Sequence, residues 1–499
     1  MCGFSGFLTR GPSSQAEVSQ SLLTHMANTI FLRGPDSVGY WSDSDSGISL
    51  GHRRLAVVDL SPSGHQPMHS GCGRYVLVFN GEVYNHLQLR QELGAIPWRG
   101  VSDTETLLAA FSAWGIAPTL KCCVGMFALA VWDRAEQTLF LARDRLGEKP
   151  LYYGWQGKGD NSCFLFGSDL AALKVHTAFS ADINRDALSL YMRHNCVPSP
   201  YTIYQGIYKL PPASLLSVSL ATRIPKIDTY WSFSQVAQQG VADPFIGSDT
   251  DAINALEDLL LQAVRQQMVA DVPLGAFLSG GIDSSLVVAL MQAQSCSPVK
   301  TFTIGFNEDG YNEAVHAKAV ARHLGTDHTE LFVTPQQALD VIPKLPSLYS
   351  EPFSDSSQIP TFLVSQMASQ HVKVCLSGDG GDELFGGYNR YTLTHQLWHR
   401  LSRLPFSVRR LAAFGICSLS PDLWNVLLQP LQSLIPQSLR QAGVGDKLHK
   451  GASVLSSSSL DDLYLDLVTH WQPDGVVIGS HEPPTALNSN QLLWSRIDD

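Results

Sequence analysis

The chain has 499 residues, a formal net charge of -11, 44% hydrophobic residues and 16% charged residues, which predicts two or three globular domains. It carries no basic stripe for a nucleic acid, no apolar run near the ~18 residues of a membrane span, and no secretory signal. We therefore expect a cytoplasmic enzyme that acts on small molecules, without nucleic-acid or membrane partners, either alone or as a homo-oligomer.

Cys2 follows the initiator methionine, and a small second residue usually allows that methionine to be removed. The thiol would then lie beside its own α-amino group, whose pKa of about 7.7–8.0 allows it to accept a proton near neutral pH. One residue would thus supply both nucleophile and base. Gly3 to Leu8 alternates small and apolar residues, as in a strand that packs closely against another backbone.

Four motifs follow in chain order: RGPD at 33–36, HRRLAVVDL at 52–60, FNGEVYN at 79–85 and SDTE at 102–105. With Cys2, they resemble the class II glutamine amidotransferases, an N-terminal-nucleophile family with a four-layer αββα sandwich. One position departs from that pattern, because Leu32 stands where the family usually has histidine.

The resemblance implies a role for each of these side chains. Catalysis is assigned to Cys2, with Asn80 and the Gly81 N–H as the oxyanion hole. Glutamine binding is assigned to Arg54 on the α-carboxylate, to Asp103 on the α-ammonium group, and to Asn80 and Glu82. The thiolate of Cys2 would attack the side-chain amide of glutamine, release ammonia and leave a thioester for hydrolysis.

Two of these motifs also have purely structural interpretations. Ser102 and Glu105 form a capping box before a helix, which is compatible with a role for Asp103 because the cap would hold that residue in place. Asn80-Gly81 is also typical of a hairpin turn. The residues that follow, Glu82 to Asn85, favour the functional interpretation.

The rest of the predicted first domain, residues 1–212, contains a helix over 18–30 and a hairpin formed by 127–133 and 138–144. Two later motifs, RDRLGEKPLYY at 143–153 and FGS at 166–168, resemble the glutamine-dependent asparagine synthetases. Pro211-Pro212 and the polar segment before residue 251 predict a connector over 213–250.

Residues 251–499 are predicted to form the second domain, which begins with a helix over 252–268 and an apolar strand over 272–278. The strand breaks at Ser279-Gly280-Gly281, and Asp283-Ser284-Ser285 opens a helix. Adjacent glycines before a helix N-terminus can direct N–H groups at a phosphate; the alternative is an ordinary strand-to-helix turn with a capping serine. No lysine follows, so this is not the GxxxxGK[ST] loop. Asp283 indicates contact with phosphate through Mg2+, and the loop resembles that of enzymes that adenylate a substrate and release pyrophosphate.

Strands and helices then alternate. We expect strands at 301–306, 329–333 and 372–376 and helices at 312–324 and 362–369. This order predicts a doubly wound parallel sheet whose ligands lie at the carboxyl ends of the strands. The fold class is therefore α/β multidomain, an αββα sandwich followed by an adenylating domain with a parallel sheet.

Ser377 to Glu383 places three carboxylates on a glycine-rich turn after a strand, which is either a solvated acidic turn or a cation site. Carboxylates there would repel ATP without a cation, so Mg2+ is expected at Asp382 together with Asp283. Because LFGGY follows, the turn resembles the asparagine synthetase motif SGEGSDEVFGGY, and Asp379 is assigned as the base when ammonia attacks. EPFSDSS at 351–357 resembles that family's substrate and nucleotide loop. The predicted ATP contacts are Leu278, Ser279, Gly280, Gly281, Asp283, Ser284, Ser285, Ile304, Ser377 and Gly378.

The resemblance implies a ligase that uses ATP and Mg2+ to amidate a carboxylate with ammonia from glutamine. Aspartate is the expected acceptor, by way of an acyl-adenylate. Two alternatives stay open: amidation of another carboxylate, such as a sugar acid in glycan biosynthesis, and a glutaminase or regulatory protein with an incomplete synthetase domain. Near the end of the chain, Ser459 is predicted to cap an amphipathic helix whose apolar face runs from Leu460 to Trp471. Because segments similar to YLPDDILVKVDRASM and EARVPFLD do not follow it, impaired synthetase activity is expected.

Overall fold

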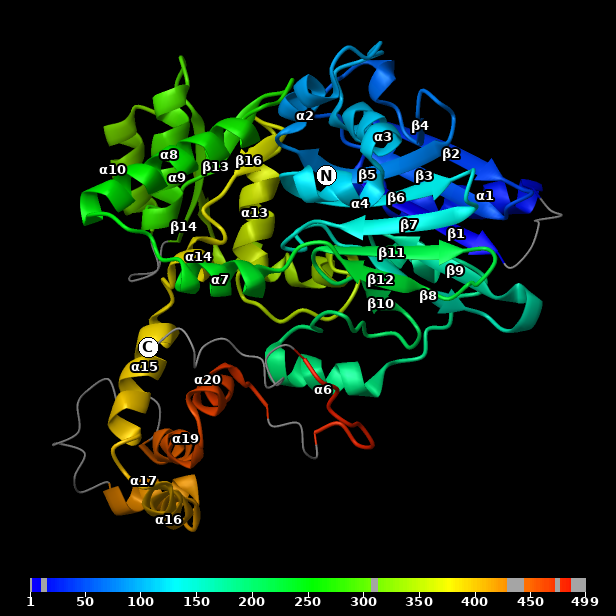
Figure 1. The fold of residues 1–499 in the computed structure, drawn as a ribbon. Helices are drawn as coiled ribbons and strands as arrows, with labels where there is room; N and C mark the ends of the chain where they lie inside the picture. The colour runs from blue at the N-terminus through cyan, green and yellow to red at the C-terminus, as the bar shows by residue number, and fades with distance from the viewer. Residues whose placement is uncertain (1, 10–15, 307–312, 429–443, 472–475, 486–499) are drawn as a thin grey trace. The chain divides into compact units, whose positions relative to one another are not determined.

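The computed structural model describes residues 2–9, 16–306, 313–428, 444–471 and 476–485 (Figure 1). Its contacts divide the chain into two units, which are described separately: Met1–Tyr191 with Asn195–Asp379, and Met192–His194 with Gly380–Asp499. The first unit contains every strand of the described chain and most of the predicted site residues.

An antiparallel sandwich forms the first part of this unit. One six-stranded sheet has the order β10 (Tyr208–Lys209), β8 (Tyr152–Gln156), β9 (Cys163–Gly167), β1 (Gly3–Thr9), β3 (Ile48–Arg54) and β2 (Ser37–Asp43). The other has the order β12 (Lys226–Thr229), β11 (Ser214–Ser219), β7 (Thr138–Arg143), β6 (Gly125–Asp133), β5 (Tyr75–Val83) and β4 (Met68–His69). The predicted hairpin corresponds to β6 and β7.

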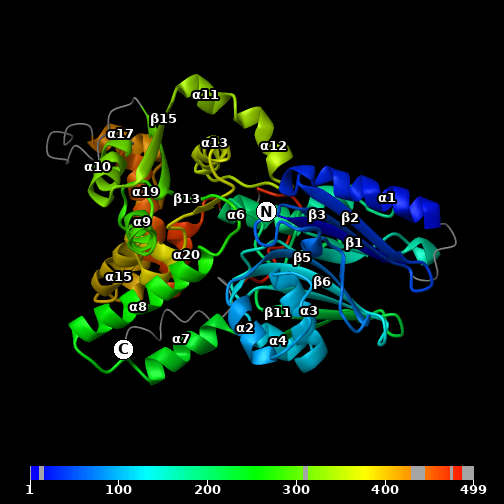
Figure 2. The same cartoon turned by 90° about the horizontal axis from the view of Figure 1, so that it is seen from above.

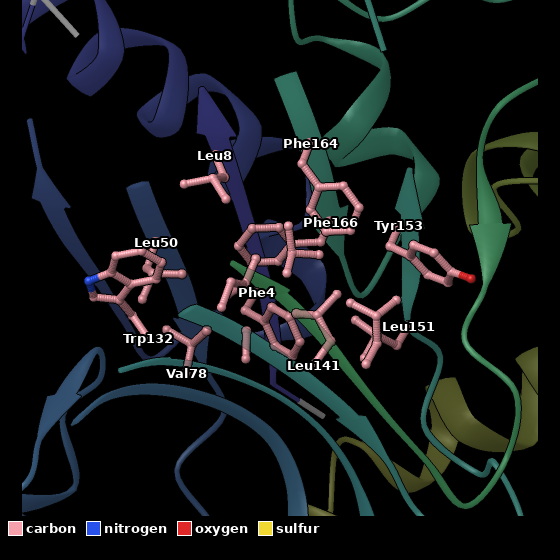
Figure 3. Packing of buried hydrophobic residues seen from close by; sticks show 14 of the residues in the cluster. Phe4, Leu8, Leu50, Val78, Trp132, Leu141, Leu151, Tyr153, Phe164 and Phe166 are labelled. Atoms are coloured by element: carbon pink, nitrogen blue, oxygen red, sulfur yellow. The ribbon is translucent and has the colours of Figure 1, made fainter. Parts of the chain in front are cut away.

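Helices cover the outer face of each sheet. Helices α1 (Ala16–Thr29) and α5 (Leu170–Lys174) pack on the first sheet, and α2 (His86–Leu93), α3 (Asp103–Trp114) and α4 (Ile116–Cys122) pack on the second (Figure 2). Alternate residues of β1 serve different layers: Phe4 and Leu8 enter the core between the sheets, whereas Phe7 faces α1. Figure 3 shows aromatic side chains filling the middle of that core. The predicted αββα sandwich is confirmed.

The sandwich extends beyond Pro212, so the prediction of a connector over 213–250 is wrong for its first part. Strand β11 pairs with β7, and β12 pairs with β11. Leu216 and Val218 belong to the core between the sheets, which explains why the sheet requires this strand. Helix α7 (Phe233–Ala242) follows and has no buried residue, in keeping with a connector over the later part.

A four-stranded parallel sheet completes the first unit, in the order β15 (Asp327–Val333), β14 (Lys300–Phe306), β13 (Leu274–Phe277) and β16 (Val374–Leu376). Helices α8 (Asp249–Gln267), α9 (Ile282–Gln294) and α10 (Ala314–Leu324) pack on one face, and α13 (Gln358–Ala368) packs on the other. The doubly wound sheet is confirmed. Because β14 and β16 flank β13, the strand order reverses direction beside β13, where such sheets bind ligands.

Two details of this sheet's helices differ from expectation. The apolar side chains that recur at helical spacing along α8 are only partly buried: Ile253 and Leu259 are both 64% exposed, whereas Val264 is 6% exposed. The reason is that the buried packing of α8 against the sheet is concentrated in its last turns. Helix α10 begins at Ala314, and Asn312, the predicted start, lies outside the described residues.

The remaining short elements of this unit connect the larger ones. They are η1 (Phe31–Arg33), η2 (Pro62–Gly64), η3 (Gly159–Asn161), α11 (Pro335–Leu339), η4 (Ile342–Lys344) and α12 (Leu345–Leu348). Helix α6 (Arg185–His194) contributes its last three residues to the second unit.

The second unit is helical: α14 (Gly381–Phe385), α15 (Asn389–Leu401), α16 (Phe406–Cys417), α17 (Pro421–Leu428), α19 (Val444–Ser456) and α20 (Leu460–Val468). Ser459 caps α20 by accepting a hydrogen bond from the Asp462 N–H, as predicted. In the described part of the chain, no single helix is long and apolar enough to cross a membrane; α16 and α17 meet the length and composition criteria only as a pair bent by 86°.

Asp144 organises the turn between β7 and β8. Its side chain is fully buried and accepts hydrogen bonds from four backbone N–H groups, those of Phe127, Leu146, Glu148 and Lys149, at 2.9–3.1 Å. Each carboxylate oxygen accepts two of these bonds. The turn therefore depends on a side chain with two acceptor oxygens.

We expect Asp144→Asn to lower the free energy of unfolding by about 3 kcal/mol, because an NH2 group replaces one acceptor and leaves buried donors unpaired. Urea unfolding followed by tryptophan fluorescence would measure the change. Asp45→Asn, at an exposed turn residue, is the matched control and should shift the midpoint little. Equal midpoints for Asp144→Asn and the wild-type chain would contradict this role.

Candidate functional site

The thiol of Cys2 is held by the backbone of Leu55, the residue that follows β3. The Leu55 N–H donates to Sγ at 3.3 Å, and Sγ lies 3.5 Å from the Leu55 carbonyl oxygen as a donor. Burial raises the pKa of the thiol, while the hydrogen bond from Leu55 opposes that rise. Arg33 Nε donates to the Cys2 carbonyl oxygen at 3.3 Å. Cys2, the predicted nucleophile, is thus held at its thiol and at its backbone by contacts from other segments.

Arg54 immediately precedes Leu55. Its side chain organises residues 54–59 (RLAVVD), which we call the glutamine loop after its predicted ligand. Its guanidinium is 8% exposed and donates to the carbonyl oxygens of Val58, at 3.4 Å, of Asp59, and of Ser61, at 3.1 Å. A β-carbon on Gly64 would lie 1.9 Å from Arg54 Nη2, so glycine is required there. The predicted contact between Arg54 and a substrate carboxylate stays a prediction, since loop carbonyls already accept from its terminal nitrogens.

Two carboxylates interact at this site, the buried Asp103 and the half-buried Glu82. Asp103 Oδ2 accepts from the Val83 N–H at 3.0 Å, and no ion pair joins Asp103 to a described Lys, Arg or His. Burial raises its pKa to about 6. Burial, and then the charge of Asp103, raise the pKa of Glu82 to about 7. The charge of Asp103 also contributes to the raised pKa of Cys2. The charge of Lys149 opposes the rise in the pKa of Glu82 without cancelling it. Such a pair of carboxylates near a thiol is suited to a cationic ligand group.

The position of Asp103 follows from its helix. Ser102 caps α3 by accepting from the Glu105 N–H at 3.3 Å, and Asp103 is the first residue of that helix. The reciprocal half of the predicted box is replaced, because the Glu105 carboxylate accepts instead from the N–H groups of Arg99 and Gly100, both at 2.9 Å. The cap and the site residue are therefore parts of one local arrangement.

Asn80 and Gly81 lie inside β5, opposite Ala128 and Phe127 of β6, so the hairpin-turn interpretation is wrong. A β-carbon on Gly81 would lie 2.1 Å from the Met126 carbonyl oxygen, and this close approach excludes any side chain. Asn80 Nδ2 donates to Ser168 Oγ at 3.4 Å, while its buried Oδ1 has no hydrogen-bond partner among the described residues.

Ser168 is a site residue to which the sequence assigned no role. Its Oγ accepts from the Phe4 N–H at 3.2 Å as well as from Asn80, and its own N–H donates to the Phe4 carbonyl oxygen at 2.9 Å. It therefore connects Asn80 in one sheet with the start of β1 in the other. Its membership of the FGS motif was the available signal, but nothing in the motif shows that β9 lies beside Asn80.

The phosphate loop has the predicted strand–turn–helix form. Gly280 has φ +82° and lies against α10, where a β-carbon would be 2.7 Å from the Ala317 N–H nitrogen. The Ser279 hydroxyl lies 2.9 Å from that of Ser284 and accepts from the Gly281 N–H at 3.2 Å. The buried hydroxyl of Ser285 has no hydrogen-bond partner among the described residues. Leu278 is buried before the turn, and Ile304 lies on the neighbouring strand β14.

The turn after β16 reaches this loop. A β-carbon on Gly378 would lie 2.7 Å from the Ser284 backbone nitrogen, so the two turns are in contact. Ser377 Oγ donates to the Asp379 carboxylate at 2.9 Å, and Asp379 is exposed. Asp382 lies in α14 of the second unit, so the proposed pairing of Asp283 with Asp382 stays a prediction. No cluster of three or more metal-ligand side chains occurs in the described ranges.

A cavity of about 300 Å³ lies beside the thiol site in the first unit. Its lining includes Arg33 and Ser168, which contact Cys2 and Asn80, and the segment Leu348–Phe353. Glu351 forms an ion pair with Lys209 at its wall, and burial raises the pKa of Glu351. The segment that resembles a substrate loop thus shares a cavity with residues of the thiol site.

Comparisons with known proteins cover most of the chain. A glutamine amidotransferase domain matches residues 1–231 and an asparagine synthase domain matches residues 255–498. A putative asparagine synthetase 2 (glutamine-hydrolyzing) of Methanocaldococcus jannaschii is 36% identical over 80% of this chain and 77% of that protein. Asparagine synthetase 1 (glutamine-hydrolyzing) of Bacillus subtilis is 36% identical over 78% and 59%. Amidase chry2 of Gibberella zeae is 30% identical over 78% and 60%. The chain thus spans about three fifths of the length of the latter two proteins.

The raised pKa of Asp103 predicts a pH-dependent cost to stability. Its pKa is 3.8 in its ordinary state and about 6 when folded, so its contribution favours folding fully below pH 4 and is lost as the pH rises through about 6. We expect Asp103→Asn to gain about 1–3 kcal/mol relative to the wild-type chain at pH 7.5, and no comparable gain at pH 4.

Urea unfolding of both chains at the two pH values would measure this difference. Asp45→Asn, at an exposed position, should show no such pH-dependent gain. If Asp103→Asn destabilises the chain equally at both pH values, burial of the charge is not the dominant effect at this position.

Proposed function

Because the chain belongs to the glutamine-hydrolysing asparagine synthetase family, we propose that it is a ligase that converts aspartate to asparagine with ATP and with ammonia from glutamine. The observation that carries the proposal is a pair of carboxylates, the buried Asp103 and the half-buried Glu82, at the site of the backbone-bound thiol of Cys2. An α-ammonium group would neutralise these carboxylates and place the rest of an amino acid near the thiol.

In the first reaction, the Cys2 thiolate attacks the side-chain carbonyl carbon of glutamine. With Met1 removed, the α-amino group of Cys2 takes the thiol proton and returns a proton to the departing ammonia. Asn80 and the Gly81 N–H would stabilise the oxyanion that forms. A thioester remains, which water hydrolyses to glutamate. The contact of Ser168 with both Asn80 and Phe4 supports this assignment, because it holds the amide beside the strand that follows Cys2.

In the second reaction, the aspartate carboxylate attacks the α-phosphate of ATP, pyrophosphate departs, and ammonia then displaces AMP from the acyl-adenylate. The N–H groups of the first turn of α9, after Gly280 and Gly281, are suited to pyrophosphate. Mg2+ would supply the positive charge that lets Asp283 lie near phosphate. Asp379 is assigned as the base toward ammonia; its exposure is compatible with contact to a substrate.

The cavity lined by Arg33, Ser168 and Glu351 supports transfer of ammonia between the two reactions. Ammonia released at Cys2 would enter it directly and reach the segment that resembles the substrate loop. Keeping ammonia out of bulk water matters because water competes for the acyl-adenylate.

A second acceptor is the alternative. Nothing in the described residues selects aspartate over another carboxylate, and a relative of similar coverage carries the name amidase. The acceptor is therefore the part of the proposal that most needs an experiment.

We expect Cys2→Ala to abolish glutamine hydrolysis and to spare synthesis from ammonium salts, because only the first reaction uses the thiol. Glutamate release and ammonium-dependent asparagine formation would be measured in parallel. Cys296→Ala, at an exposed cysteine, is the control and should retain both activities. Glutamine hydrolysis by the Cys2→Ala variant would refute the assignment of the nucleophile.

We expect pyrophosphate release that requires ATP, Mg2+ and aspartate, and a loss of at least about tenfold in Asp283→Ala, because that variant lacks the carboxylate next to the phosphates. Release would be measured across a panel of carboxylates, with Asp258→Ala, an exposed residue of α8, as the control. Release with a different carboxylate would establish the alternative acceptor. Glutamine hydrolysis without pyrophosphate release from any carboxylate would refute the ligase proposal.

A further inference from the structure

The glutamine loop is hydrogen-bonded to Asp271, in the segment that leads into the parallel sheet. The Asp271 N–H donates to the Val57 carbonyl oxygen at 2.9 Å. The Asp271 carboxylate accepts from the Asp59 N–H at 2.8 Å. One residue therefore binds the loop at two points, only two and four residues after the Leu55 backbone that holds the Cys2 thiol.

The hydrogen bond from the Asp59 N–H to Asp271 stabilises an unusual backbone conformation in the loop. Asp59 has φ +58°, a left-handed conformation that is unfavourable for a residue with a side chain. Its own carboxylate accepts from the N–H groups of Ser61 and Val101, at 3.1 and 2.9 Å. Its N–H is bound by Asp271. Since the Asp59 carbonyl oxygen accepts from Arg54, the conformation of Asp59 also determines where that guanidinium lies.

A second connection joins the glutamine loop to the segment before β16, through Asp36 and Lys373. Asp36 accepts from the Ala56 N–H at 2.8 Å and forms an ion pair with Lys373 at 2.6 Å. The Lys373 N–H donates to the Pro273 carbonyl oxygen at 3.0 Å. Asp271 thus binds the loop directly, and Lys373 binds it through Asp36. The backbone hydrogen bond to Pro273 places Lys373 next to the segment that contains Asp271.

Asp271 lies three residues before strand β13, and Lys373 lies directly before strand β16; both strands lead to the candidate nucleotide loops. Strand β13 begins at Leu274 and β16 at Val374, and these residues pair with each other in parallel register. The strands are four and three residues long, or about 10–13 Å, and end at Ser279–Ser285 and Ser377–Asp379. Two short, paired strands therefore join the glutamine loop to the candidate phosphate site.

We propose that Asp271 is a positioning residue for glutamine hydrolysis, and that Asp271 and Lys373 couple the glutamine loop to the strands β13 and β16. The inference rests on the proposed function, because it assigns glutamine hydrolysis to Cys2. Asp271 holds Val57 and Asp59, these residues hold the loop that carries Arg54 and Leu55, and Leu55 holds the thiol. Asp271 does not touch the reacting atoms.

The exposed position of Asp271 allows a clean test, because its substitution removes no core packing. Asp271→Ala removes the acceptor for the Asp59 N–H, whereas Asp271→Asn keeps an amide oxygen that can accept the same bond. Asp258→Ala, at an exposed residue of α8, is the matched control. The full chain would be assayed for glutamine hydrolysis, for ammonium-dependent pyrophosphate release, and for the rate at which iodoacetamide alkylates Cys2, followed by mass spectrometry.

We expect Asp271→Ala to lower kcat/KM for glutamine about tenfold, mainly through KM, and to leave ammonium-dependent activity unchanged. Cys2 should be alkylated at least about threefold faster, because the Leu55 N–H no longer holds the thiol in place. Asp271→Asn should stay within about threefold of the wild-type chain in each assay, and Asp258→Ala should match it.

Unchanged glutamine kinetics and alkylation in Asp271→Ala would overturn the proposal. So would an equal fall of the glutamine- and ammonium-dependent activities, which would indicate general destabilisation. A wild-type chain that does not hydrolyse glutamine would refute the proposed function instead. In that case the alkylation rates still decide whether Asp271 positions the loop, since that measurement needs no turnover.

Discussion

The site depends on the hydrogen bonds that hold the glutamine loop in one conformation. The Arg54 guanidinium turns back onto the carbonyl oxygens of its own loop, and the Leu55 backbone then lies against the thiol of Cys2. A backbone N–H cannot move to another rotamer as a side-chain donor can. The hydrogen bond from Leu55 therefore restricts the position of the thiol. The orientation of the nucleophile is therefore a property of the loop rather than of one catalytic side chain.

The same region contains two carboxylates whose repulsion and burial are unfavourable for the free energy of folding. The buried Asp103 and the half-buried Glu82 carry charges that repel each other, and no described residue forms an ion pair with Asp103. Protein interiors rarely contain such groups without a functional reason, because an unpaired buried charge is unfavourable. An amino acid that brings an α-ammonium group would relieve this cost, which links its binding energy to its correct placement beside Cys2.

The main role of the parallel sheet at this site is to fix the position of the glutamine loop relative to the two turns that follow β13 and β16. Strand β13 and the edge strand β16 start near the glutamine loop and lead to the two turns that contact each other through Gly378 and the first turn of α9. Because paired strands are stiff along their length, a shift at one end is expected to reach the other. The cavity next to Arg33 and Ser168 also borders residues 348–353, the segment that resembles a substrate loop. One unit thus contains both candidate sites and the two strands that lie between them.

The sequence by itself determined the elements and the residue types of both sites, because the alternation of Gly3 to Leu8, the cap at Ser102 and the break at Ser279 are local patterns with local causes. It did not identify β11 as a strand of the sandwich, since Leu216 is buried only by residues distant in sequence. Nor did it assign Ser168 to Asn80, or Asp271 to Asp59, because those contacts join residues 88 and 212 positions apart. Only the tertiary structure decided them, since a hydrogen bond between distant segments depends on how sheets and loops pack, and no short stretch of sequence encodes that.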